Sequence, residues 1–359
     1  MTQTTTTESP MTIGIDIGDQ YSFFAVLDHT GEITEEGRLR TTPAAFSRKF
    51  AKCTPARVAI EVGTHSPWIN ELLLSAGHEV LVANPRKLRF IFRGDNKNDR
   101  VDAQQLARVA RLDPSLLSPI HHRKRESRVD LSFLRARDGL VRARTRLVNQ
   151  VRGLVKPFGT RLPSCSTTTF ATRIAREIPK ELRPAIVPLL RVIQLLTKKI
   201  MRMKKRLESI AAENYPEVSR LQQVSGVGIV TATTFVLTLE DPYRFKSSRS
   251  VGAYLGLRPK RRQSGKSDPE LRISKAGDRD LRMLLVQCGQ YILGPFGKDS
   301  DLRRLGLALA ERGNKSAKRK AVVAVARKLA VLLHRLWVSG EDYEPLRNII
   351  RREAIPQLS

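Results

Sequence analysis

Residues 11–112 alternate short apolar runs with amphipathic stretches in an order that few folds accommodate. Three apolar runs separated by turns come first, and they predict sequential antiparallel strands at 11–18, 21–28 and 31–39. Helical and strand patterns then alternate, which predicts a helix at about 43–53, a strand at 57–63, a helix at 66–77, a strand at 78–85 and a helix at 98–112. The order β-β-β-α-β-α-β-α predicts an α/β domain, a mixed sheet with helices on its faces.

The rest of the chain has a helical pattern. Two long amphipathic stretches, 128–155 and 172–213, predict a helical hairpin that is either a coiled coil with a dimer contact or a plain linker. Pro184 and Pro188 are the places where a break in the second helix is expected. Residues 221–239 place a Gly-x-Gly turn between short helices and resemble a helix-hairpin-helix element, whose turn amides bind phosphate. Further helices are expected at 278–293 and 314–337. We therefore expect a disordered tail at 1–10, an α/β domain at 11–120, a basic helical region at 121–216, an all-α domain at 217–340 and a tail at 341–359.

Charge divides the chain in the same way. Of 64 basic and 35 acidic residues, residues 1–120 hold 14 of each, so residues 121–359 hold 50 basic and 21 acidic ones and the whole net charge of +29. A neutral N-terminal part followed by a strongly basic C-terminal part favours a catalytic domain joined to a surface that binds a polyanion. The alternative, a basic surface that contacts only solvent, is less favoured. Three scattered cysteines, no signal core and no long apolar run predict a cytoplasmic protein without a membrane contact.

Four acids stand where carboxylates are costly or share a face. Asp16 lies inside the first apolar run, Glu61 ends the fourth strand, and Asp99 and Asp102 begin a helix three residues apart. Carboxylates that converge near strand ends need a hard cation, and magnesium prefers such oxygen ligands. Singly, each acid has a plainer interpretation: a turn acid, a loop cap, a helix N-cap and a partner of the helix dipole.

The motifs resemble one family along most of the chain. GIDIG, AIEVGTHSPW and NKNDRVDAQQLA in the front, with VSGVGIVTATTF, FKSSRSVGAYLGLRP and RISKAGDRDLRMLL in the rear, are similar to the DEDD transposases of bacterial insertion sequences. The resemblance covers roughly residues 11–340 and implies an RNase H-like fold of the Holliday-junction-resolvase branch. Its metal-binding catalytic acids fall on Asp16, Glu61, Asp99 and Asp102, and its reactive serine falls on Ser274.

The resemblance also implies partners and a mechanism. It implies a DNA transposase that uses Mg²⁺, forms a serine–DNA link, is guided by a structured RNA and works near the bacterial nucleoid. Because recombination holds several strands, a homo-oligomer, a dimer or tetramer, is expected. Without the resemblance, Ser274 is either part of a loop that ends at Asp278, the expected cap of the next helix, or a local cap itself. Seven cations near it in sequence are candidate nucleic-acid contacts: Arg258, Lys260, Arg261, Arg262, Arg272, Lys275 and Arg279.

Three other functions fit parts of the sequence. Residues 16–22 resemble the first phosphate loop of sugar kinases and actin-like ATPases, but the place of the second Asp-x-Gly motif reads Glu61-Val62-Gly63. A resolvase-like nuclease would use water as the nucleophile, with no covalent intermediate. A purely architectural DNA-binding protein would leave the acid in the first strand unexplained.

Overall fold

The computed structural model describes residues 11–348 except 86–97, 266, 270, 312 and 314. The expected tail at 1–10 and residues 349–359 of the expected C-terminal tail lie outside the described residues. The chain divides into two compact units, residues 1–123 and residues 124–359, and each is described by itself.

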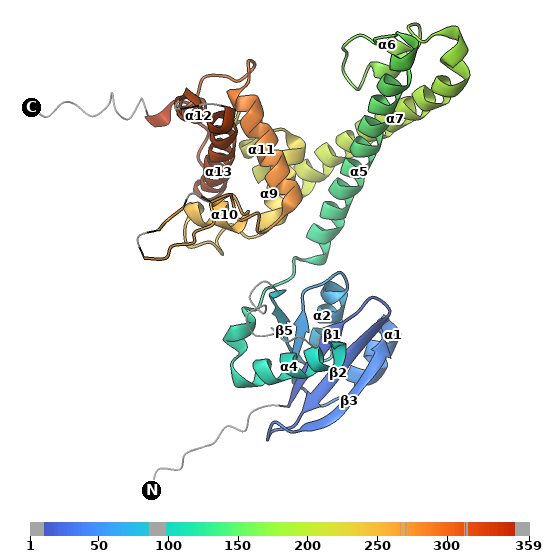
Figure 1. Cartoon of the computed structure of the whole chain (residues 1–359). Coiled ribbons are helices and arrows are strands. Elements are labelled where there is room, and N and C mark those ends of the chain that lie inside the picture. The colour runs from blue at the N-terminus through green and yellow to red at the C-terminus, as the bar shows by residue number, and fades with distance from the viewer. Residues whose placement is uncertain are drawn as a thin grey trace, which may run out of the picture. The chain divides into compact units, whose positions relative to one another are not determined.

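The first unit is a five-stranded mixed sheet with helices on both faces (Figure 1). The order of elements confirms the sequence prediction: β1 Thr12–Ile17, β2 Tyr21–Leu27, β3 Ile33–Arg40, α1 Pro43–Phe50, β4 Arg57–Glu61, α2 Ser66–Ser75, β5 Glu79–Ala83 and α4 Asp99–Leu112. The strands lie in the order β3-β2-β1-β4-β5, with β1 antiparallel to β2 and parallel to β4. This is the RNase H-like arrangement that the sequence predicted.

Successive side chains of a strand point to opposite faces of the sheet. Ile13 and Ile15 of β1 are fully buried against Phe46 of α1 and Ile69 of α2. The residue between them, Gly14, faces α4: a Cβ atom there would lie 2.0 Å from the carbonyl oxygen of Ala103. The absent side chain therefore lets α4 pack directly on β1.

The second unit begins with a hairpin of two long helices, α5 Arg125–Leu154 and α7 Arg183–Asn214 (Figure 1). The second helix was expected from residue 172 but begins at Arg183; residues 170–174 instead form the separate short helix α6. Pro184 agrees with the late start, because it lies in the first turn of α7, where proline removes no intrahelical hydrogen bond; Pro188 lies inside α7 without ending it. One apolar cluster closes the end of the hairpin near α6, and another joins the hairpin to α9.

The remainder is an all-helical domain around one apolar core, as expected. Its helices are α8 Glu217–Leu221, α9 Ile229–Leu239, α10 Ser248–Tyr254, α11 Arg279–Leu293, α12 Asp301–Glu311 and α13 Lys315–Ser339. Phe235, Leu285 and Leu329 are fully buried in the core. Tyr343, expected in a tail, also packs on it, and the Pro345 carbonyl accepts from the Asp301 amide at 2.8 Å. Among the described residues, no helix is both long and apolar enough to cross a membrane.

Candidate functional site

Two of the predicted acids lie side by side in the sheet. Ile15 of β1 is paired with Ile60 of β4 in parallel register, so Asp16 and Glu61 occupy the next positions of the two strands. Asp16 follows Gly14 by two residues, and Glu61 follows Ala59, which packs in the cluster that contains α4 residues. Both half-buried acids therefore belong to the face of the sheet that α4 covers.

Helix α4 presents its first turn to the same end of the sheet. Ala103 and Ala107 lie over Gly14, whereas the Arg57 guanidinium, at the start of β4, contacts the Ala110 carbonyl at 3.4 Å. The helix thus runs opposite to β1 and β4, and its N-terminus lies toward the strand ends that bear Asp16 and Glu61. Asp99 and Asp102 occupy this first turn.

The cap of α4 decides between two interpretations of Asp99. The side chain of Asn98 accepts from the Arg100 amide at 3.1 Å, so Asn98 is the N-cap. Asp99 is exposed and does not have the capping role, and Asp102 is half-buried. Arg100 is held instead by Glu36 of β3 through its Nε atom at 2.7 Å, and this contact lowers the pKa of the Glu36 carboxyl.

The four carboxylates share one face and one end of the sheet, but they are not assembled into a metal site. Among the described residues, no three His, Cys, Asp or Glu side chains are arranged to hold a metal ion. The donor chemistry, four carboxylates from two strands and a helix, fits a hard cation.

A titratable pair at this end of the sheet was missed by the sequence reasoning. His65 follows β4 and contacts the carboxylate of Asp19, which follows β1, with 3.2 Å between Nε2 and Oδ1. The Trp68 indole donates to the other ring nitrogen of His65 at 3.2 Å. The only sequence signal was a histidine and an aspartate that each follow a strand bearing one of the acids.

Ser274 lies in the second unit, on the loop between α10 and α11. The Ser274 amide donates to the Arg258 carbonyl at 2.9 Å, and the Lys260 amide donates to the Arg272 carbonyl at 3.0 Å. These antiparallel bonds bring four of the predicted residues together. Ser274 is half-buried, and its Oγ accepts a long bond, 3.4 Å, from the Ala276 amide.

The seven predicted cations are all exposed: Arg258, Lys260, Arg261, Arg262, Arg272, Lys275 and Arg279. Of these, Arg261 forms an ion pair with Asp268, 3.4 Å apart. Asp278 caps α11, as expected, by accepting from the Leu281 amide at 2.8 Å. Arg258, paired with Ser274, and its chain neighbours Arg272 and Lys275 therefore present exposed positive charge near the serine, a setting that suits a phosphate.

Arg282 fixes this loop and was not singled out from the sequence. Its guanidinium donates to the carbonyls of Leu255, Ala276 and Asp278 at 3.1, 2.7 and 3.3 Å. Gly277 is equally constrained, because its φ is +70° and an added Cβ would lie 2.1 Å from the Tyr254 oxygen. An arginine one turn into α11 carries no sequence signal for this role.

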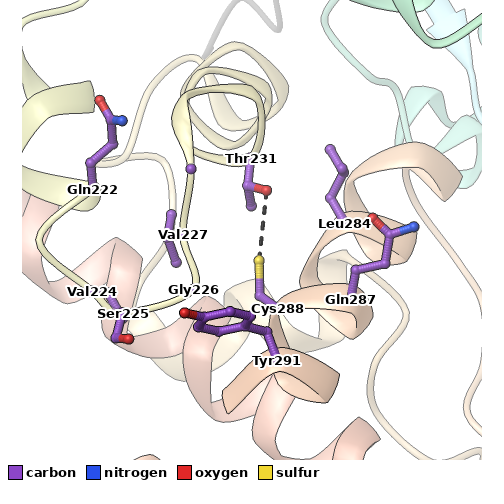
Figure 2. A pocket seen from close by; sticks show the side chains of 11 residues that line it. Gln222, Val224, Ser225, Gly226, Val227, Thr231, Leu284, Gln287, Cys288 and Tyr291 are labelled. Atoms are coloured by element: carbon purple, nitrogen blue, oxygen red, sulfur yellow. Dashed lines mark hydrogen bonds between the residues drawn. The ribbon is translucent and has the colours of Figure 1, made fainter. Parts of the chain in front are cut away.

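The helix-hairpin-helix-like turn lines an open pocket of about 440 Å³ (Figure 2). Gly226 has a φ of +90° and lies against Tyr291, and Gly228 precedes α9 without a side-chain cap. Cys288 points toward Thr231, with 3.6 Å between sulfur and oxygen (Figure 2). Burial raises the pKa of the Cys288 thiol, which favours its neutral form.

Comparison with known proteins finds the same family in both units. Residues 13–158 match a family model for DEDD transposases, and residues 218–298 match the model described as the transposase IS116/IS110/IS902 family. The first match contains the four acids and the second contains Ser274.

Three relatives match over most of their length. The transposase for insertion sequence element IS1111A of Coxiella burnetii is 27% identical over 92% of this chain and 90% of its own. The transposase for insertion sequence element IS1328 of Yersinia enterocolitica is 29% identical over 78% and 83%. A probable family 20 transposase of Pseudomonas aeruginosa is 28% identical over 93% and 98%.

The fold and the two matched regions together define a transposase. The chain belongs to the IS116/IS110/IS902 family of insertion-sequence transposases, the DEDD class. Membership assigns it DNA recombination as its activity and DNA as its substrate. Transposases of this class are generally metal-dependent.

Proposed function

We propose that this protein excises and inserts a mobile DNA element, and that it cuts and rejoins strands through a serine–DNA link assisted by Mg²⁺. The observation that carries the proposal is the setting of Ser274, which stands on a loop fixed by Arg282 among exposed cations. The runner-up is a resolvase-like nuclease in which water makes the cut and no covalent link forms.

Asp16, Glu61, Asp99 and Asp102 are the residues that would hold the metal. Their carboxylates come from the same end and face of the sheet, and they are the ligand type that magnesium prefers. When bound, magnesium would polarise the scissile phosphate and reduce the negative charge that an attacking oxygen meets.

Ser274 is the proposed nucleophile. Its Oγ attacks the phosphorus, an Oγ–P bond forms, and the bond from phosphorus to a deoxyribose oxygen breaks. The serine proton is released and the departing oxygen takes one up, so no redox partner is needed. A hydroxyl of a second strand later attacks the same phosphorus and frees Ser274. Arg272, Lys275 and Arg279 offset the charge of the pentavalent transition state.

The decisive experiment traps this link. The reaction is stopped with denaturant, digested with protease and searched for a peptide that contains Ser274 attached to DNA. Ser274→Ala should fold and bind DNA but exchange no strands. Ser267 is an exposed serine of the same loop, and Ser267→Ala should behave as wild type. Efficient cleavage without an adduct, together with cleavage by Ser274→Ala, would establish the resolvase-like reaction instead.

The metal ligands are tested by single substitutions. Asp16→Ala, Glu61→Ala, Asp99→Ala or Asp102→Ala should abolish strand cleavage while DNA binding persists through the basic unit. Glu79→Gln is the matched control, because Glu79 begins β5 at the opposite end of the same sheet, paired with Arg57. Full cleavage in excess chelator would contradict a metal-assisted reaction.

A structured guide RNA and a homo-oligomer, a dimer or tetramer, complete the proposal. The RNA follows from the family resemblance and is supported physically by the basic residues along 123–152 and 312–328, which could track phosphates without reading bases. Residues 312 and 314 lie outside the described part. Protein that recombines its DNA after all RNA has been removed would contradict the guide.

A further inference from the structure

The turn that follows α11 contains Phe296, whose side chain is exposed to solvent. Phe296 is 78% exposed, whereas Phe46, Phe170 and Phe235 are fully buried. An exposed phenylalanine forgoes the stabilisation that burial of its ring would give. Its exposed position therefore suggests a contact with a partner.

The turn holds Phe296 in one position. The Gly297 amide donates to the Gly294 carbonyl at 3.2 Å, which closes a turn over Pro295 and Phe296. The Arg303 guanidinium donates to the Gly294 carbonyl at 2.6 Å and also to the Ile292 carbonyl. A backbone fixed in this way presents the ring with little further loss of conformational entropy on binding.

Gly297 shows how tightly the turn is packed. A Cβ at this position would lie 2.0 Å from the Ile292 oxygen and 2.4 Å from the Arg303 guanidinium. A second Pro-Phe-Gly sequence, Pro157-Phe158-Gly159, lies beyond the end of α5 and exposes 56% of its phenylalanine. A Cβ at Gly159 would contact nothing within 4 Å, so the two turns share a sequence but only the one at Phe296 is packed in place.

We propose that Phe296 stacks on an unpaired base of the DNA strand that the transposase handles. Residues 121–359 carry the whole charge excess, and the exposed Lys298 lies two residues away for a phosphate contact. Aromatic side chains on basic surfaces bind single strands in this way, because every base offers a π face. The proposal rests on DNA as the substrate and is independent of the chemistry of Ser274.

Binding of labelled single-stranded DNA, followed by fluorescence anisotropy over a salt series, tests this. Phe296→Ala should weaken binding by about tenfold, the cost of one lost stack. The salt dependence should keep its slope, since no phosphate contact is removed. Phe296→Tyr and Phe296→Trp keep an aromatic face and should restore affinity. A 2-aminopurine base placed along the strand should lose fluorescence on binding wild type but not Phe296→Ala.

Phe158→Ala is the matched control and should leave the affinity unchanged. The assay measures single-strand binding without strand cleavage, so its result does not depend on whether Ser274 is the nucleophile. Equal affinity of Phe296→Ala and wild type would overturn the proposal. So would a change confined to self-association, measured by sedimentation, because the ring would then face a second copy of the chain.

Discussion

Lys275 has a left-handed backbone, with a φ of +55°, immediately after Ser274. Its amide donates to the carbonyl of Gly256 at 3.0 Å, and Gly256 itself has a φ of +69°. A non-glycine residue adopts this conformation only where its surroundings impose it, and such positions cluster at functional sites. The loop therefore holds the backbone of Ser274 in a defined place.

Gly277→Ala tests whether this backbone matters. The new Cβ would combine a positive φ with a 2.1 Å approach to the Tyr254 oxygen, so we expect a loss of about 1–3 kcal/mol in unfolding free energy and weaker formation of the serine–DNA adduct. Gly139→Ala, in the exposed middle of α5 with nothing within 4 Å, should instead gain about 0.5–1 kcal/mol. Denaturant unfolding of both variants measures these changes in unfolding free energy. Equal stability of Gly277→Ala and wild type would show that the loop rearranges freely.

Asp28, in the turn between β2 and β3, should make the stability of the fold depend on pH. Its Oδ1 accepts from the Thr30 hydroxyl and from the amides of Thr30, Gly31 and Glu32, and the Thr30 hydroxyl contributes most to lowering its pKa from 3.8 to about 2. Because the folded pKa lies below the unfolded one, the carboxylate stabilises the fold above pH 3.8 and this contribution is lost as pH falls toward 2.

An NMR titration of the Asp28 carboxyl group should therefore give a midpoint near pH 2. Asp28→Asn should be less stable than wild type at pH 6, and the difference should shrink as pH falls below about 4. A titration midpoint at the ordinary pKa of an aspartate would mean that the hydrogen bonds of the turn do not stabilise the charged carboxylate. A stability difference between Asp28→Asn and wild type that does not change with pH would mean the same.

At the scale of elements, the packing of α4 on β1 positions the acids. Gly14→Ala would place a Cβ 2.0 Å from the Ala103 oxygen and 2.5 Å from the Ala107 nitrogen, so α4 must move. We expect a loss of at least about 1–3 kcal/mol in unfolding free energy and a larger loss of cleavage than of DNA binding. Gly63→Ala, beside the same strand end with nothing within 4 Å, is the control and should change neither. If a folded Gly14→Ala protein cleaves DNA as wild type does, the packing of α4 on β1 does not position the acids for cleavage.

The order of the first unit's elements could be read from the sequence because strand and helix periodicities are local. The start of α7 could not, since Pro184 and Pro188 are both compatible with a helix break and only packing selects one. The positions of the acids at strand ends were predictable, but their spacing depends on how far α4 lies from the sheet. Arg282 donates to the Leu255 carbonyl, 27 residues away, and Gly277 approaches the Tyr254 carbonyl; no local pattern reveals either contact.

At the scale of the whole molecule, the acids and Ser274 belong to different units. A transposase must cut and hold several strands, and closed symmetric oligomers supply several active sites. The two halves of one active site could then come from one protomer or from two. The charge division agrees with the proposed function: the neutral residues 1–120 contain the four acids, and the basic residues 121–359, which contain Ser274, would bind the phosphates of DNA.

Mixing two inactive proteins distinguishes these arrangements. Asp16→Ala supplies an intact Ser274, and Ser274→Ala supplies intact acids. If each site takes acids from one protomer and serine from another, every mixed dimer contains one complete site. A one-to-one mixture should then recover about a quarter of wild-type strand cleavage, because half of randomly formed dimers are mixed and each has one working site of two. If sites form within a protomer, no mixed dimer cleaves. Inactive mixtures in which sedimentation shows normal exchange of protomers would therefore place Ser274 beside the acids of its own chain.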